Sequence, residues 1–208
     1  MIGPFDGPAD ARLAPPVAFD TRPVTPDRVD DFVAVANPNR RASHCWCLSH
    51  RLTAGEIEEH GSREAAFREL CGRPNPPGVI GYADGEPVGW CSIGPRAENT
   101  RLTRSRLIRP LDDVAVWSII CVVIRGGHRK RGHTTPLIEG AVAYAASRGA
   151  PAVESYPVDP GPGRIDVTMA FVGTRAMFEK AGFIVVGSTG AVASKLPRIV
   201  MRRSTSRA

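Results

Sequence analysis

A basic stretch followed by a helical pattern is the part of the sequence best suited to chemistry. The residues from His128 to Gly140 read HRKRGHTTPLIEG and come directly after the apolar run WSIICVVI. Backbone N–H groups in the first turn of a helix lack intrahelical partners, and the helix dipole adds partial positive charge there, so a phosphate group binds readily. Arg129, Lys130 and Arg131 add full positive charges. The pattern therefore indicates a pyrophosphate site, with an exposed basic turn as the alternative.

Two residues of this stretch define the loop and the start of the helix. Gly132 lets the backbone approach a ligand closely because it has no Cβ. Pro136 has no N–H group and so belongs in the first helical turn, which predicts a helix start within residues 132–135. The loop matches neither the P-loop pattern nor G-x-G-x-x-G. An ordinary nucleoside triphosphate or NAD site is therefore disfavoured.

The elements that must hold this loop are strands and helices in alternation. Residues 114–124 are apolar and rich in β-branched side chains, which predicts a buried central strand. Residues 79–95 predict a hairpin. Other strands are predicted at 17–24, 151–158, 183–188 and 198–203, and helices at 25–36, 53–72 (interrupted or bent near Gly61), from 132–135 to 149, and 173–182. A strand, helix and strand within 114–157 imply a parallel pair. We therefore expect an α/β fold with a mixed central sheet and helices on both faces.

Length and composition favour a single domain. The chain has 208 residues, of which 42% are hydrophobic and 23% are charged. We expect a flexible N-terminal arm at 1–16, the domain at 17–203 and a basic tail at 204–208. The N-terminus lacks the apolar segment of a signal peptide, and no apolar run approaches the roughly 18 residues that a membrane helix needs. These features predict a cytoplasmic protein with no membrane partner.

The charge and the cysteines narrow the partners further. A formal net charge of +6 favours an anionic ligand, but no motif and no interleaved aromatic residues indicate nucleic acid, so we expect none. The segment HCWCLSH, residues 44–50, has Cys and His close together. Its spacing differs from that of ordinary zinc sites, so we expect no metal and interpret the segment as packing around a tryptophan.

The basic stretch resembles a family signature. RKRGHT, residues 129–134, is similar to the R/Q-x-x-G-x-G/A signature of the GNAT superfamily of acyl-CoA N-acyltransferases. Arg129 and Gly132 match the signature, and Thr134 stands where Gly or Ala is usual. MFEKAGF, residues 177–183, resembles the family segment LYExxGF. The CWC and GWC segments, at 45–47 and 89–91, resemble those of a bacterial subgroup, and the likeness extends over residues 17–203.

The resemblance implies a single GNAT-type domain in which coenzyme A lies between two parallel strands that splay apart. Backbone groups of Cys121, Val122 and Val123 would then meet the pantetheine arm. The pyrophosphate would be held by Arg129, Lys130, Arg131, Gly132, His133 and Thr134. The implied reaction transfers an acetyl group from acetyl-CoA to a small-molecule or peptide amine by direct attack. The loop at 37–53 is expected to contribute to the acceptor site, and the assembly is left open between a monomer and a homodimer.

Proton transfer is the chemical difficulty of such a reaction. An alkylammonium with a pKa near 10.4 is only about one part in a thousand neutral at pH 7.4, which costs roughly 4 kcal/mol. Glu154 and Tyr156, on the strand after the helix, are the candidates for the catalytic base. Phe178 occupies the position where many family members have a tyrosine that protonates the departing thiolate, so water, Tyr156 or Ser155 is expected to replace it. The alternative is a non-catalytic sensor of acyl-CoA with the same fold.

Overall fold

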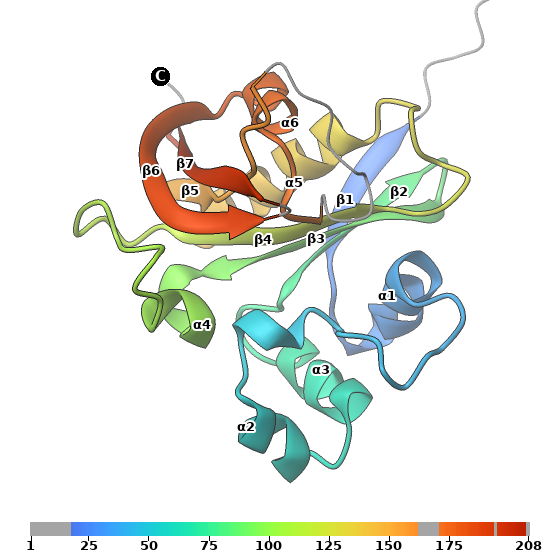
Figure 1. Ribbon diagram of the computed structural model, residues 1–208. Helices are drawn as coiled ribbons and strands as arrows, with labels where there is room; N and C mark the ends of the chain where they lie inside the picture. The colour runs from blue at the N-terminus through green and yellow to red at the C-terminus, as the bar shows by residue number, and fades with distance from the viewer. Residues whose placement is uncertain (1–17, 162–170, 194, 207–208) are drawn as a thin grey trace, which may run out of the picture.

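A seven-stranded mixed sheet forms the centre of the molecule (Figure 1). The computed structural model describes residues 18–161, 171–193 and 195–206, so the N-terminal arm expected at 1–16 lies outside the described residues. In sheet order, the strands are β1 (Phe19–Pro23), β2 (Gly78–Ala83), β3 (Glu86–Pro95), β4 (Trp117–Ile124), β5 (Ala152–Ser155), β7 (Leu196–Ser204) and β6 (Ile184–Ala193). Every neighbouring pair is antiparallel except β4 and β5, which are parallel. The predicted mixed sheet with a central parallel pair is confirmed.

Short helices connect these strands. They are α1 (Val29–Ala36), α2 (Ala54–Glu59), α3 (Arg63–Cys71), α4 (Thr100–Thr103), α5 (Thr134–Ser147) and α6 (Arg175–Lys180). The helical pattern at 53–72 is interrupted near Gly61, as expected: Thr53 caps α2 with a capping box, and the Ser62 side chain caps α3. The segment before β4, for which the sequence predicted no helix, contains α4. Within the described ranges, no helix is both long and apolar enough to cross a bilayer.

Helices cover both faces of the sheet, as predicted. On one face α5 packs across β1, β2 and β3, and α6 packs against α5 and β7. Gly140 allows this close approach, because a Cβ at that position would overlap the Thr21 side chain of β1. On the other face α1 packs on β3 and β4 (Figure 1). There Phe32, Trp46, Phe67 and Trp90 form a buried aromatic cluster.

The last strand extends beyond residue 203, where the sequence predicted the domain to end. Ser204, placed in the expected basic tail, is the last residue of β7 and pairs with Ala152. The backbone N–H of Thr205 donates to the carbonyl oxygen of Pro151 at 3.1 Å. The last strand therefore runs the full length of β5 and holds it from the side opposite β4.

Candidate active site at the splayed strands

The parallel strands β4 and β5 stay together over only three residue pairs. Trp117 pairs with Val153, Ser118 with Glu154 and Ile119 with Ser155. Beyond Ile119, β4 continues to Ile124 in register with β3 alone, whereas β5 ends at Ser155. The edge of β4 after Ile119 is therefore open toward the space that β5 leaves, which is the splay that the resemblance predicted.

A β-bulge lies at the point where the strands part. Ser92 of β3 pairs with Cys121 and Ile93 pairs with Ile119, so Ile120 is an extra residue in β4. Bulges bend a strand and redirect the side chains that follow. Here Val122 packs in the core under α5, while Cys121 packs in the core under α1. The open part of β4 therefore presents side chains to the cavities on its two sides.

The first cavity, which we call the strand–loop cavity, lies where β4 ends and α5 begins. It has a volume of about 430 Å³. Its lining comes from β4, the basic loop, the start of α5 and two apolar residues of the C-terminal region, namely Val122, Val123, Ile124, His128, Arg129, Lys130, His133, Thr134, Phe171 and Met177. The structure thus brings together six predicted cofactor residues: Val122, Val123, Arg129, Lys130, His133 and Thr134.

The charges at this cavity are only partly balanced. Arg125 donates to the Glu86 carboxylate at 2.8 Å, and His128 lies 3.6 Å from the same carboxylate. In contrast, Arg129, Lys130 and Arg131 form no ion pair with any described residue; Arg129 donates only to the carbonyl oxygen of Ile124. The loop therefore presents three positively charged side chains without a carboxylate partner among the described residues.

The start of α5 supplies backbone donors to the same region. The first helical hydrogen bond comes from the N–H of Leu137 to the carbonyl oxygen of His133, so the N–H groups of Thr134 and Thr135 are left without helical acceptors. The His133 ring stacks on Phe19, with 5.6 Å between ring centroids. Burial, with His128 and Arg131 nearby, lowers the pKa of His133. A neutral histidine therefore flanks the free N–H groups.

Two predicted cofactor residues face a neighbouring hollow. Arg131 and Gly132 line a cavity of about 390 Å³ between the loop and the β2–β3 turn. Gly132 has a φ of +82°, and apart from its chain neighbours no described residue lies within 4 Å of the position of a Cβ, so the backbone conformation rather than crowding requires glycine there. Lys130 also has a positive φ, of +63°. The loop therefore turns sharply between residues that line the strand–loop cavity and residues that line this hollow.

A second large cavity, which we call the thiol cavity, lies on the other side of β4. It has a volume of about 660 Å³. Its lining comes from the last residue of α1, the 44–50 segment, α4, β4, residues 171–172 and the β6–β7 hairpin: Ala36, His44, Cys45, Cys47, Ser49, His50, Arg101, Cys121, Val123, Phe171, Val172, Val192, Ala193 and Arg198. Val123 and Phe171 line both cavities. The two cavities therefore adjoin at the splayed part of β4, and Cys121 belongs to the second one.

The CWC segment forms part of the wall of this cavity. Trp46 and Cys47 both have positive φ values, of 51° and 54°, and the Trp90 indole N–H donates to Cys47 Sγ at 3.2 Å. A hydrogen bond with Cys121, together with burial, raises the pKa of Cys47 well above its usual value. The Cys47 thiol is therefore protonated at neutral pH. In the described part of the chain, no three His, Cys, Asp or Glu side chains are grouped to hold a metal ion.

Glu154 and Tyr156 form a buried polar network. Tyr156 Oη donates to Glu154 Oε2 at 2.8 Å and lies 3.3 Å from Ser118 Oγ. Arg202 donates to Glu154 Oε1 at 2.7 Å, and Arg96 donates to Tyr156 Oη at 3.2 Å. Burial raises the pKa of Tyr156 to about 12, with the Glu154 charge adding to the effect. The pair is thus brought together beside the splay, but neither residue lines the two cavities.

Phe178 and Ser155 lie on the other side of β5 from this network. Phe178 is fully buried, packs edge-to-face on Phe183 with 5.1 Å between centroids, and lines neither cavity. Ser155 is also fully buried, and its Oγ has no hydrogen-bond partner among the described residues. The residue is the last one of β5, at the point of separation. Its hydroxyl is therefore an unused donor beside the splay.

Sequence reasoning missed the charged residues of the thiol cavity. Arg101 comes from α4 and Arg198 from β7, so they are far apart in the chain and no motif contains them. His50, from the 44–50 segment, also lines the cavity. The only available signal was the density of arginines in residues 101–109. A local pattern of this kind does not reveal which arginine faces a cavity.

The chain can now be compared with known proteins. A mixed sheet whose central parallel pair splays beside a basic loop and a helix start is the arrangement expected of an acyl-CoA-dependent acyltransferase. The model of the acetyltransferase (GNAT) family matches residues 42–183. The chain therefore belongs to the GNAT acetyltransferase family. No curated relative matches it.

Solved structures share this fold at low sequence identity. The aminoglycoside acetyltransferase AAC(6')-Ib, in complex with ribostamycin and coenzyme A, has a TM-score of 0.53 and 15% identity, over 90% of this chain and 93% of that chain. A GNAT family acetyltransferase from Bacillus cereus ATCC 10987 has a TM-score of 0.52 and 13% identity, over 91% of this chain and 99% of that chain. An N-acetyltransferase from Staphylococcus aureus Mu50 has a TM-score of 0.51 and 12% identity, over 91% and 99%.

Proposed function

We propose that the protein transfers an acetyl group from acetyl-CoA to the amine of a small molecule or peptide. The observation that carries this proposal is the meeting of two cavities at the open part of β4, one basic and one largely apolar, with Val123 and Phe171 in both walls. A bisubstrate reaction needs two sites that share one boundary, because the reacting atoms must come within bonding distance. Membership of the acetyltransferase family supports the same reaction.

The strand–loop cavity is the proposed site for coenzyme A. The free N–H groups of Thr134 and Thr135 and the unpaired cations of Arg129 and Lys130 suit the pyrophosphate. The main chain of residues 121–123, open on the β5 side, suits the amide groups of the pantetheine arm. Arg131 and Gly132, on the far side of the loop, are proposed to complete the cradle through charge and backbone. The crystallised neighbour with ribostamycin also contains coenzyme A.

The thiol cavity is the proposed acceptor site. The amine nitrogen attacks the thioester carbonyl carbon, a C–N bond forms, and the C–S bond breaks to release the thiolate. The nitrogen loses one proton, and the thiolate gains one. For the first transfer we propose water that relays the proton from the cavity to the chain of Ser118, Tyr156 and Glu154, whose hydroxyls and carboxylate are within hydrogen-bond distance of one another. For the second we propose Ser155, whose hydroxyl has no other partner in the described structure.

A thiol-release assay tests the proposed reaction. Acetyl-CoA is incubated with the protein and a panel of amines, peptides and aminoglycosides, and free thiol is measured over time. We expect release that depends on the amine and increases with pH as the amine loses its proton. Saturable binding of acetyl-CoA without thiol release from any acceptor would favour the alternative, a non-catalytic acyl-CoA sensor.

The proton route has its own test. Glu154→Gln keeps the shape of the side chain but removes its charge, so we expect kcat to fall by about 10²-fold or more. The pH at which kcat increases should also differ from that of the wild type. Acetyl-CoA affinity is measured in parallel as a control. A pH profile of kcat that matches the wild-type profile would mean that Glu154 acts only in the structural network with Arg202.

A further inference from the structure

The charges of the thiol cavity have one sign. Arg101 and Arg198 are its charged residues, and no Asp or Glu is among the described residues that line it. Neither arginine forms an ion pair with a described residue; Arg198 donates only through Nε to the carbonyl oxygen of Tyr156, at 2.7 Å. Burial, together with the charges of Arg101 and Arg198, lowers the pKa of His50 to about 4. Burial also lowers the pKa of His44, so at neutral pH the cavity contains two permanent cations and two neutral imidazoles.

The rest of the cavity wall is mostly apolar, with Ser49 and the two histidines as its other polar side chains. Val123, Val172 and Ala193 provide aliphatic surface, and the Cys45 and Cys47 thiols, whose pKa values are raised, are protonated. Phe171 and Val192, at 44% and 69% exposure, are large apolar side chains left open to solvent in a structure that buries most of its others. Exposed apolar groups that line a cavity are typical of a ligand site. The occupant should therefore have an apolar body.

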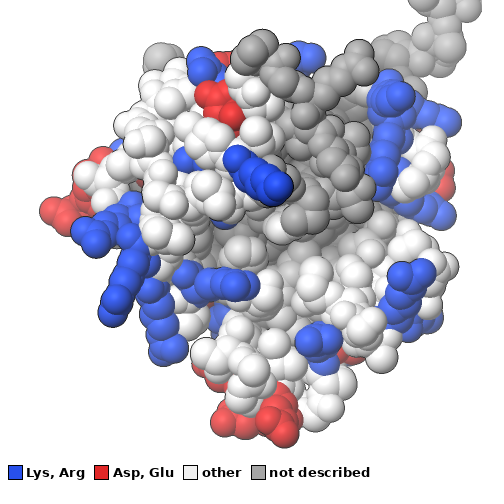
Figure 2. Space-filling view, in the orientation of Figure 1, with Lys and Arg blue, Asp and Glu red and all other residues white. Residues whose placement is uncertain are grey.

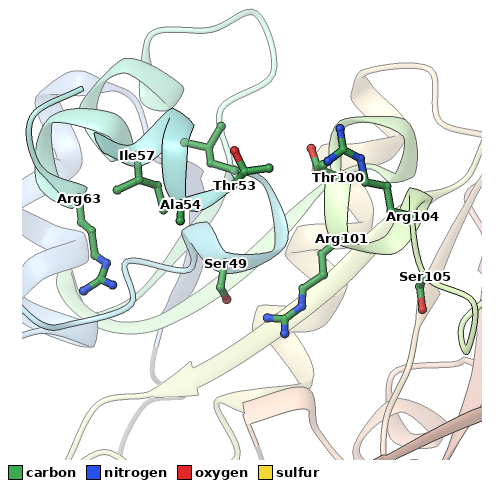
Figure 3. Close-up of a pocket in the computed structure, with 10 residues that line it drawn as sticks. Ser49, Thr53, Ala54, Ile57, Arg63, Thr100, Arg101, Arg104 and Ser105 are labelled. Carbon is green, nitrogen blue, oxygen red and sulfur yellow. The ribbon is translucent and has the colours of Figure 1, made fainter. Parts of the chain in front are cut away.

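A further hollow adjoins the thiol cavity, and its charged residues are also all positive. It has a volume of about 680 Å³ and shares Ser49 and Arg101 with the thiol cavity. Its lining, shown in Figure 3, includes two further arginines, Arg63 and Arg104, and no described Asp or Glu. In Figure 3 the Arg101 side chain extends from α4 toward the side of Ser49, away from Arg104. Outside the grey atoms, the middle of this face is white and blue in Figure 2, and the red carboxylates lie around it.

We infer that the acceptor is an amine with an apolar body and an anionic group such as a carboxylate, which Arg101 and Arg198 bind. This inference rests on the proposed acetyl transfer. A carboxylate would supply the counter-charge that the two guanidinium groups lack in the described structure, through hydrogen bonds of the strongest kind found in proteins. The aliphatic and thiol surface would take the body of the molecule.

The same charges argue against a polycation. An aminoglycoside brings several ammonium groups, and these would lie near two arginines without a described carboxylate to receive them. Like charges within such a site are unfavourable. For a single amine the field has a different effect: nearby cations and apolar walls lower the pKa of the ammonium group, which increases the fraction of the neutral nucleophile. The cavity thus favours the reactive form of a monoamine while its anionic group is bound.

Matched pairs of amines test the inference. Thiol release is measured with phenylalanine and 2-phenylethylamine, with tryptophan and tryptamine, and with 4-(aminomethyl)benzoate and benzylamine, together with kanamycin. Within each pair the apolar body and the amine are retained and only the carboxylate is lost. We expect kcat/KM, corrected for the fraction of neutral amine, to be about tenfold higher for the carboxylate member of at least one pair, the size expected of a charge-assisted hydrogen bond.

Arginine variants connect the preference to the site. Arg101→Gln is expected to reduce kcat/KM for the preferred carboxylate substrate by about fivefold, since Arg101 is exposed, and Arg198→Gln by about tenfold, since Arg198 is half-buried. Arg198→Lys, which keeps the charge, should recover part of the loss. Arg106→Gln is the matched control, because Arg106 is exposed in the same basic segment and lines neither cavity. The amines without carboxylate should respond little to any of these changes.

The outcomes separate this inference from the proposed function. Thiol release with kanamycin or with uncharged amines, and no preference for any carboxylate member, would overturn the inference and leave acetyl transfer intact. A carboxylate preference that survives both glutamine variants would overturn the assignment to Arg101 and Arg198. Acetyl-CoA binding without thiol release from any member of the panel would remove the proposed reaction itself, and the acceptor inference with it.

Discussion

Reversing the charge of Lys130 gives a quantitative test of the cofactor cradle. Lys130 lines the strand–loop cavity and has no described ion-pair partner. At a separation of about 6 Å in a solvent-like dielectric, two unit charges interact by about 0.7 kcal/mol. Lys130→Glu changes the local charge by two units opposite the two charges of pyrophosphate, which gives about 3 kcal/mol, and physiological salt reduces this by roughly half. We therefore expect acetyl-CoA affinity to fall about tenfold.

Calorimetry at two salt concentrations checks this expectation. Since the Debye length falls to about 3 Å at 1 M salt, the difference between wild type and Lys130→Glu should nearly disappear there. Arg148→Glu is the matched control, because Arg148 follows α5 at its opposite end and the substitution changes the net charge equally. An affinity within twofold of wild type, or a loss equal to that of Arg148→Glu, would refute the assignment of the cradle.

Three further predictions concern stability and can be measured by urea unfolding. Between pH 6.5 and about 4 the unfolded chain binds a proton at His50 that the folded chain does not, because burial lowers the folded pKa to about 4. The free energy of unfolding should therefore decrease by up to about 3 kcal/mol as pH falls through this range, and His50→Gln should remove that part; an unchanged pH slope would contradict it. Gly140→Ala should cost about 1–3 kcal/mol, because its Cβ would overlap Thr21, and a neutral effect would mean that α5 can move outward. Tyr156→Phe should cost about 2 kcal/mol, because it leaves Glu154 Oε2 without its buried donor, and a smaller loss would indicate that water replaces the hydroxyl.

The local parts of the fold could be predicted from the sequence. The apolar strand predicted at 114–124 and found at 117–124, the hairpin around Asp84 and the start of α5 near Thr134 all depend on neighbours in the chain: β-branched residues, a turn residue and a proline. Gly132 was singled out because it lets a ligand approach the backbone, whereas its positive φ is known only from the structure. These signals are encoded within about ten residues, so one sequence was enough to place them.

The proposed acceptor site could be predicted only in part. The loop at 37–53 was expected to contribute to it, and its segment 44–50 lines the thiol cavity. The two arginines of this cavity come from α4 and β7, which lie nearly one hundred residues apart and meet only in the folded chain. The polar network presents the same difficulty, because Arg202 reaches Glu154 across the β5–β7 pair. The pattern of apolar residues shows whether a segment is a strand or a helix. It does not show which side chains from distant parts of the sequence contact that segment.

The bulge in β4 changes which residue numbers face which layer. Before the bulge, the odd-numbered residues Trp117 and Ile119 lie in the core under α5; after it, the even-numbered Val122 does, and the odd-numbered Cys121 and Val123 turn to the layer of α1. One inserted residue thus reverses which positions of the strand, odd or even, face each side of the sheet. The bulge therefore decides which side chains of β4 turn toward α5 and which turn toward α1.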